Sequence, residues 1–157
     1  MGLVLVILTV AVHGYDVLAD PLGWLLVAFG VRALGGRTTS PLLTTAVVAG
    51  AISCALWFPA FRAVLHPSAE WALSLPELLF AFLLCNELMH RAGADGRIYR
   101  TIRWAFVVVA VIPVLVYGGK VHGLGSTALF LGVMSVIVLD VLLFMHANRA
   151  WAHPQEA

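Results

Sequence analysis

The sequence is poor in charged residues: Asp, Glu, Lys and Arg make up only 11% of its 157 residues, against about 25% in an average soluble domain. Hydrophobic residues make up 62%, and the mean hydropathy is +0.99. A soluble fold of this size cannot bury so much apolar surface. The composition therefore excludes a soluble globular domain and a disordered chain. It indicates an integral membrane protein whose first partner is the lipid bilayer.

Cysteine, lysine and basic clusters are also scarce. The two cysteines, Cys54 and Cys85, form no Cys-x-x-Cys pair, so neither a disulfide framework nor a zinc pattern is present. The net charge is +1 and the sequence has no basic stripe, which argues against a nucleic-acid partner. The basic residues are nearly all arginine and alanine is abundant, a bias typical of a bacterial chain from a GC-rich genome.

The sequence contains several long apolar runs. A membrane-spanning helix needs about 20 apolar residues. The runs predict a single all-α domain over 1–157, a bundle of about six transmembrane helices. The first two helices are short, so they either thin the bilayer locally or form a re-entrant hairpin. The predicted spans are about 2–14, 21–35, 41–61, 75–92, 99–117 and 124–148.

Helix-start signals fall between these runs. Asp20-Pro21 and Ser40-Pro41 each predict an N-cap followed by a proline at the first helical position, where the missing N–H costs nothing. Ser74-Leu75-Pro76-Glu77 has the pattern of a capping box, in which the Glu side chain bonds back to the cap. The predicted helix caps are Asp20, Ser40, Ser74 and Glu77.

Arginine positions predict the orientation. With the N-terminus in the cytoplasm, the outer loops hold only Arg62 and Lys120. The positive-inside rule then predicts a multi-pass protein of the bacterial cytoplasmic membrane, with both termini in the cytoplasm. The inner loops and tail would hold Arg32, Arg37, Arg91, Arg97, Arg100, Arg103 and Arg149.

Asp140 lies in the apolar run Ile137–Leu143, and ionisable groups inside a membrane are the default functional candidates. It is expected either to form a structural ion pair with Arg103 or Arg32, or to bind a proton or an ion during transport. Asn86 and Glu87 are expected to bond across helices or to face the cytoplasm. The intramembrane polar candidates are Asp140, Arg103, Arg32, Glu87 and His90.

A second group of polar residues gathers at the predicted outer face. A continuous helix would place His13, Asp16 and Asp20 on one side, because their spacing is i, i+3, i+7. Imidazole and carboxylate groups can bind Zn²⁺ or a similar cation, so the metal candidates are His13, Asp16, His66 and His122. No ligand spacing specifies a metal, and no two histidines share the mid-membrane depth that haem ligation needs. No cofactor is therefore predicted.

Small residues recur on two of the predicted helices. Ala46, Gly50 and Cys54 repeat every four residues on the third, and Gly125, Ala128, Gly132 and Ser135 form a ridge on the sixth. Such ridges let helix backbones approach closely in lipid, which favours other membrane helices as partners.

The segment His13–Gly30, HGYDVLADPLGWLLVAFG, contains the turn Asp20-Pro21-Leu22-Gly23-Trp24. It resembles the first helical hairpin of small bacterial membrane proteins that carry an Asp-Pro-x-Gly-Trp motif. The resemblance implies a polytopic membrane protein, and it implies no activity and no site residues. From the residues themselves, Asp20 caps the helix, Gly23 allows close packing, and Trp24 is expected to anchor the membrane interface.

Three functions remain open on this evidence. The favoured one is a non-catalytic membrane component, either an accessory subunit of a larger complex or a self-associating bundle. The second is a small transporter or channel in which Asp140 is the coupling group. The third is a metal- or redox-linked membrane enzyme that uses the outer histidines. An enzyme is disfavoured because the sequence contains no Gly-x-Ser-x-Gly, Ser-x-x-Lys or His-Glu-x-x-His motif.

Overall fold

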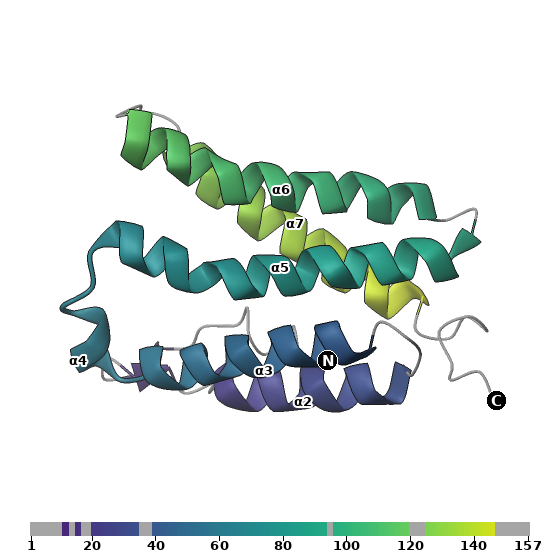
Figure 1. Cartoon of the computed structure of the whole chain (residues 1–157), viewed down its shortest axis with the longest axis horizontal. Helices are drawn as coiled ribbons and strands as arrows, with labels where there is room; N and C mark the ends of the chain where they lie inside the picture. Colours follow the sequence, from purple (N-terminus) through teal and green to yellow (C-terminus); the bar gives the residue numbers. More distant parts are fainter. Residues whose placement is uncertain are drawn as a thin grey trace. The chain divides into compact units, whose positions relative to one another are not determined.

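The computed structural model describes residues 11–12, 15–16, 20–34, 39–93, 96–119 and 125–146. The chain divides into two compact units, Met1–Glu77 and Leu78–Ala157, so that helix α5 contributes to both. The predicted all-helical class is confirmed for the described residues, apart from one pair of very short strands (Figure 1). In chain order the elements are β1 (Ala11–Val12), β2 (Tyr15–Asp16), α2 (Asp20–Leu34), α3 (Thr39–Leu56), α4 (Pro59–Arg62), α5 (Pro67–Arg91), α6 (Gly96–Gly119) and α7 (Gly125–His146).

The strands correct the predicted start of the chain. The predicted span 2–14 lies mostly outside the described residues, but its described residues Ala11–Val12 form β1 instead of helix. Val12 pairs with Tyr15, and Ala11 with Asp16, in an antiparallel register. β-Branched and aromatic residues favour strands, and Gly14 between them is a poor helix former. Asp16 itself lies in β2, so it does not belong to a continuous helix that would place it on one side with Asp20.

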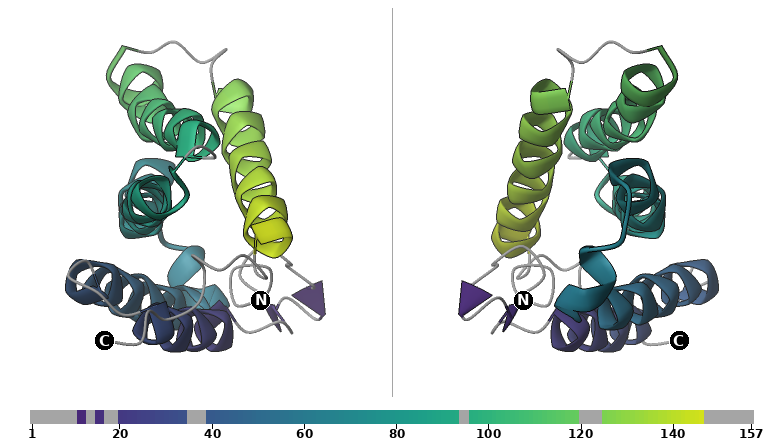
Figure 2. Two further views of the ribbon diagram at one scale, coloured as in Figure 1. Left: turned by 90° about the vertical axis from the view of Figure 1, so that its right-hand side faces the viewer. Right: turned by 90° about the vertical axis from the view of Figure 1, so that its left-hand side faces the viewer.

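In the first unit, α2 and α3 run side by side in opposite directions (Figures 1 and 2). Their contact buries apolar residues at helical spacing on both helices: Trp24, Val27 and Val31 on α2, and Leu42, Ala46 and Ala49 on α3. This contact uses the small-residue ridge predicted on the third span, because a bulky side chain there would hold the two helices apart.

Proline decides where α3 ends. The structure ends this helix at Leu56, short of the predicted boundary at 61. Phe58 precedes Pro59 and takes an extended conformation, with φ −81° and ψ 119°, because the proline ring clashes with a helical residue before it. Pro59 then starts the separate short helix α4.

The predicted capping box at Ser74–Glu77 is wrong, because α5 already begins at Pro67. His66 caps this helix: its carbonyl accepts the N–H of Ala69 at 2.8 Å, and its Nδ1 accepts the N–H of Ser68 at 3.3 Å. Ser74 lies inside the helix, where its hydroxyl donates to the carbonyl of Trp71 at 2.8 Å.

The other two predicted caps have different outcomes. Ser40 lies inside α3, which begins at Thr39, and its carbonyl accepts the hydroxyl of Thr44 at 2.9 Å. Ser40 is therefore not the N-cap of α3. The predicted start differs from the observed one by an amount similar to the usual uncertainty in assigning helix ends. The side chain of Asp20 lies outside the described part of the chain, so its capping role stays a prediction.

In the second unit, α6 and α7 lie side by side (Figure 2), and Gly132 of α7 lies at their contact. A Cβ atom placed on Gly132 of α7 would lie 3.4 Å from Cγ1 of Val109 on α6, so the predicted ridge on the last helix packs against α6 at this glycine. The core of this unit is mostly apolar, with the phenol of Tyr99 and the hydroxyl of Ser135 also buried. Its larger members are Phe80, Leu84, Cys85, Leu88, Tyr99, Ile102, Phe106 and Leu139.

Two glycines form the turn from α5 to α6. Gly93 has φ 55°, the left-handed conformation that ends many helices. A Cβ on Gly96 would lie only 2.6 Å from the carbonyl oxygen of Met89, so the start of α6 contacts the backbone of α5 directly. This close approach brings side chains near the end of α5 within reach of those near the start of α6.

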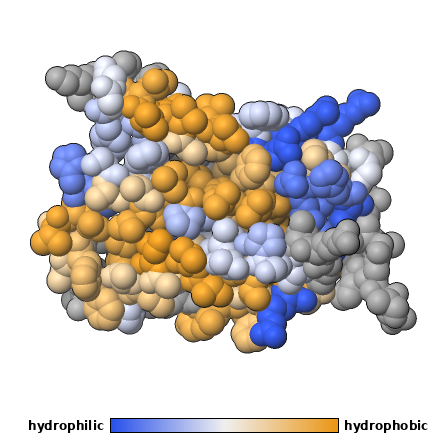
Figure 3. Space-filling view, viewed as in Figure 1, coloured by the Kyte–Doolittle hydropathy of each residue, from blue (hydrophilic) through white to orange (hydrophobic). Residues whose placement is uncertain are grey.

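Three described helices are long and apolar enough to cross a membrane: Thr39–Leu56, Pro67–Arg91 and Gly96–Gly119. The described apolar stretches of the remaining long helices, Leu22–Leu34 and Phe130–His146, are shorter. Figure 3 shows hydrophobic colour over much of the visible face of the helices. These features indicate a membrane protein.

Gly50 allows a direct test of the α2–α3 packing. A Cβ at this position would lie 3.0 Å from Cβ of Trp24, whereas a Cβ at Gly30 has nothing within 4 Å. We expect Gly50→Leu to lower the free energy of unfolding by about 1–3 kcal/mol through overpacking. Gly30→Leu, which gains the same helix propensity, should not lower it. Thermal unfolding in detergent, followed by circular dichroism, measures both; equal stability of the two variants would contradict the packing.

Candidate functional site

The polar side chains of the second unit make specific contacts near the α5–α6 turn. Nη1 of Arg103 on α6 donates a hydrogen bond to Oδ1 of Asn86 on α5 at 2.8 Å. The guanidinium carbon also lies 5.4 Å from the ring centroid of Phe82 and 5.7 Å from that of Trp104. A charge-assisted hydrogen bond and cation–π contacts both offset the cost of moving a cation out of water. The prediction that Asn86 bonds across helices is thus confirmed.

Glu87 forms an ion pair on its own helix. Its Oε1 accepts from Nε of Arg91 at 2.6 Å, and both side chains are largely covered, with 14% and 20% of their surface exposed. A Glu one turn before an Arg is the favourable orientation for such a pair, because it also suits the helix dipole. Glu87 is therefore engaged in a local contact at the end of α5, and His90 beside it is exposed.

Tyr99 and His146 join α6 to α7. The tyrosine is fully buried, and its hydroxyl lies 3.2 Å from Nδ1 of His146. The same Nδ1 lies 2.8 Å from the carbonyl oxygen of Leu142, one turn earlier on α7. Nδ1 of His146 thus lies between the buried phenol and the helix backbone, within hydrogen-bond distance of each. Sequence reasoning missed both residues; the available signal was a tyrosine at helical spacing with the apolar positions Ile102 and Phe106.

Asp140 has a different environment. It is partly exposed on α7, next to the buried Leu139, and no hydrogen bond or ion pair joins it to any side chain that the structure describes. Arg103 bonds Asn86 in place of Asp140, so the structure does not form the first of the two predicted ion pairs. Arg32 is exposed on α2 in the first unit, and its pairing with Asp140 stays a prediction.

In the first unit, Glu77 lies near a hydroxyl of the neighbouring helix. Oγ of Ser53, which is buried on α3, donates to Oε1 of Glu77 on α5 at 3.4 Å. Glu77 thus has a partner across helices instead of its predicted role as a cap. The Ser53 hydroxyl in turn is satisfied within an otherwise apolar helix.

The metal candidates are only partly described. His66 is exposed and its Nδ1 serves as the cap of α5, with the Ser68 hydroxyl at 2.8 Å. His13, His122 and the side chain of Asp16 lie outside the described residues. Within the described residues, no group of three or more His, Cys, Asp or Glu side chains is placed to hold a metal ion. The prediction of no resident cofactor stays a prediction.

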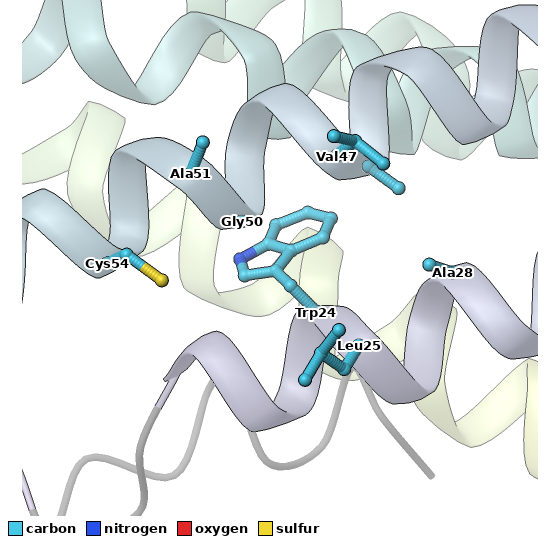
Figure 4. Close-up of a pocket in the computed structure, with 8 residues that line it drawn as sticks. Trp24, Leu25, Ala28, Val47, Gly50, Ala51 and Cys54 are labelled. Atoms are coloured by element: carbon cyan, nitrogen blue, oxygen red, sulfur yellow. The ribbon is translucent and has the colours of Figure 1, made fainter.

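A groove lies between α2 and α3 in the first unit, with a volume of about 240 Å³ (Figure 4). The indole of Trp24 extends from α2 toward Gly50 of α3 and forms its floor. Trp24 is only 3% exposed, so it packs on α3 and does not serve as the predicted interfacial anchor. Gly50 is the reason, because its missing side chain leaves room for the ring. The groove is almost wholly apolar and is lined also by Leu25, Ala28, Ala46, Val47, Ala51 and Cys54.

No protein-family model matches this chain, and no curated protein or solved structure is significantly similar to it.

The contact between Asn86 and Arg103 can be tested with a pair of substitutions. Asn86→Leu leaves the guanidinium without its acceptor, so we expect a loss of about 1–3 kcal/mol in the free energy of unfolding. Asn86→Leu combined with Arg103→Met removes both polar partners and should recover much of that loss. Chemical denaturation in detergent, followed by circular dichroism, measures each variant. Strictly additive losses would show that the two side chains do not interact.

Proposed function

We propose that this chain is a non-catalytic integral membrane protein that works by associating with other membrane helices. It would be an accessory subunit of a larger complex or a self-associating bundle. One observation carries the proposal: only 22%, 28% and 17% of the residues in the most apolar parts of α3, α5 and α6 are buried within the chain. Most residues in these parts therefore keep some surface outside the chain's own core, where lipid or other helices can contact it.

The outward surface supports association because it includes large aromatic residues. Phe29, Phe130 and Phe144 expose 67%, 66% and 77% of their surface. Large exposed apolar patches mark membrane or protein contacts, and in lipid helices associate through shape and packing. Meanwhile several polar side chains are engaged in contacts between helices, as in the pairs Asn86–Arg103 and Tyr99–His146. Such contacts support a structural role for these polar groups.

The proposed location is the bacterial cytoplasmic membrane, with both termini in the cytoplasm. The support is the arginine distribution along the sequence, since cytoplasmic loops carry the excess of basic residues. The α5–α6 turn, flanked by Arg91, Arg97 and Arg100, would then lie at the cytoplasmic face.

Membrane insertion and association can be measured on the full chain. We expect the protein to stay in the membrane pellet after alkaline carbonate washing, because α3, α5 and α6 are long and apolar enough to cross a membrane. After extraction in mild detergent, light scattering should give a mass above one chain, or a defined second protein should co-purify in a fixed ratio. A carbonate-soluble chain would contradict insertion, and an inserted chain that is strictly monomeric and alone would contradict association.

A second candidate function is ion or proton transport through Asp140. It is favoured by a carboxylate on the apolar helix α7 without a bonded partner among the described side chains, since such groups mark ion pathways in membranes. In proteoliposomes with an imposed potential, the wild type should then acidify or alkalise the lumen. Asp140→Asn should abolish this flux, and Glu70→Gln, which changes an exposed carboxylate of α5, should preserve it. Equal flux from empty vesicles would contradict transport.

A further inference from the structure

The start of α6 concentrates positive charge where a helix does not favour it. Arg97, Arg100 and Arg103 lie within its first two turns, and that first turn contains no acidic residue. The N-terminus of a helix carries a partial positive charge, so cations there are destabilising and anions are stabilising. Figure 3 shows hydrophilic colour where α5 ends and α6 begins. An anion bound near these arginines would therefore stabilise the start of the helix.

Neighbouring carboxylates do not supply enough negative charge. From Glu87 to Arg103 the sequence has the acidic residues Glu87 and Asp95 against Arg91, Arg97, Arg100 and Arg103. Glu87 is paired with Arg91, and Asp95 lies outside the described residues. Arg97 and Arg100 are both exposed, and no ion pair joins either to a side chain that the structure describes. The surface at this point has a surplus of cations.

The same face of α6 continues as an exposed apolar stripe. Arg97, Arg100 and Trp104 lie opposite the buried Tyr99, Ile102 and Phe106, as expected for 3.6 residues per turn. Beyond Trp104 this face carries exposed apolar residues at helical spacing: Val108, Val111 and Leu115. Two cations at one end and a run of apolar side chains along the rest match the two parts of a phospholipid.

The length of α6 places the arginines at the depth of lipid headgroups. Its 24 residues correspond to about 36 Å at 1.5 Å per residue, and the hydrocarbon core is about 30 Å thick. Roughly one turn therefore extends into the headgroup layer. Trp104, which exposes 57% of its surface, has the amphipathic ring that is enriched at this boundary.

We propose that Arg97 and Arg100 bind the headgroup of an anionic phospholipid, whose acyl chain lies along Trp104, Val108 and Val111. This inference rests on the proposed membrane insertion of the chain. Each guanidinium donates to phosphate oxygens, for which its planar fork is suited. Arg103, held by Asn86, keeps a third positive charge fixed beside them. An anionic lipid is selected over a zwitterionic one because the latter carries its own cation, which the arginines repel.

Native mass spectrometry of the full chain in detergent tests this, with equal concentrations of phosphatidylglycerol and phosphatidylcholine. We expect the wild type to retain phosphatidylglycerol in clear excess. Arg97→Gln and Arg100→Gln should each weaken its apparent affinity about fivefold, the usual effect of one basic residue near an anionic surface. Arg32→Gln, which removes an exposed arginine of α2, is the matched control and should retain wild-type selectivity.

Several outcomes would overturn the proposal. Equal retention of the two lipids excludes selectivity, and the same loss in Arg32→Gln and Arg100→Gln shows an unspecific effect of net charge. Displacement of the lipid by an equal concentration of glycerol phosphate shows that a free phosphate ester, without acyl chains, is the ligand. Circular dichroism confirms that each variant keeps its helix content. A chain that resists carbonate extraction but lacks selectivity refutes only this inference, whereas a carbonate-soluble chain refutes the proposed function itself.

Discussion

Polar groups on the apolar helices of this protein have to find partners within the chain, because hydrocarbon offers none. Asn86 accepts from Arg103, Tyr99 meets His146, and Ser53 donates to Glu77. Hydroxyls that do not cross between helices donate one turn back along their own, as Ser135 does to the carbonyl of Leu131. Because these side chains bond within the chain, the outer faces of the helices can remain largely apolar, and that apolar surface is the basis of the proposed association.

Glycines determine where neighbouring helices of this protein come closest to one another. Gly50 admits the indole of Trp24, Gly132 admits α6, and Gly96 contacts the carbonyl of Met89. The contact of Gly96 matters most for the hydrogen bond between Arg103 and Asn86. It places the end of α5 against the start of α6, and so brings Asn86 within hydrogen-bond distance of Arg103.

The sequence predicts the existence of the long helices well, because each coincides with an apolar run. It predicts their ends poorly where two proline signals compete. Ser74-Pro76-Glu77 fits a capping pattern better than His66-Pro67 does, yet α5 begins at Pro67. A helix in a nonpolar setting tolerates an internal proline, since neighbouring groups satisfy the freed carbonyl. The pattern at Ser74 is therefore compatible with a helix that begins there and with a helix that begins at Pro67 and continues through Pro76.

The sequence indicates which polar side chains lie on the helices better than it indicates which residues those side chains contact. Charge alone pairs Arg103 with Asp140, whereas the structure pairs it with the neutral Asn86, because the glycine turn fixes α5 beside α6. Trp24 lies near the start of a helix, and a tryptophan at that place in a membrane helix is expected to anchor the interface. Its burial depends on Gly50, a residue of another helix, and nothing local in the sequence indicates that contact.

The two cysteines of the chain differ sharply in accessibility. Cys85 is fully buried in the second unit, whereas Cys54 is exposed and lines the groove between α2 and α3. A thiol-reactive reagent should therefore modify the folded, unaltered protein at one position. A fluorophore or spin label introduced there would report on whatever covers α3 in the membrane, whether acyl chains or another helix, without any engineered residue.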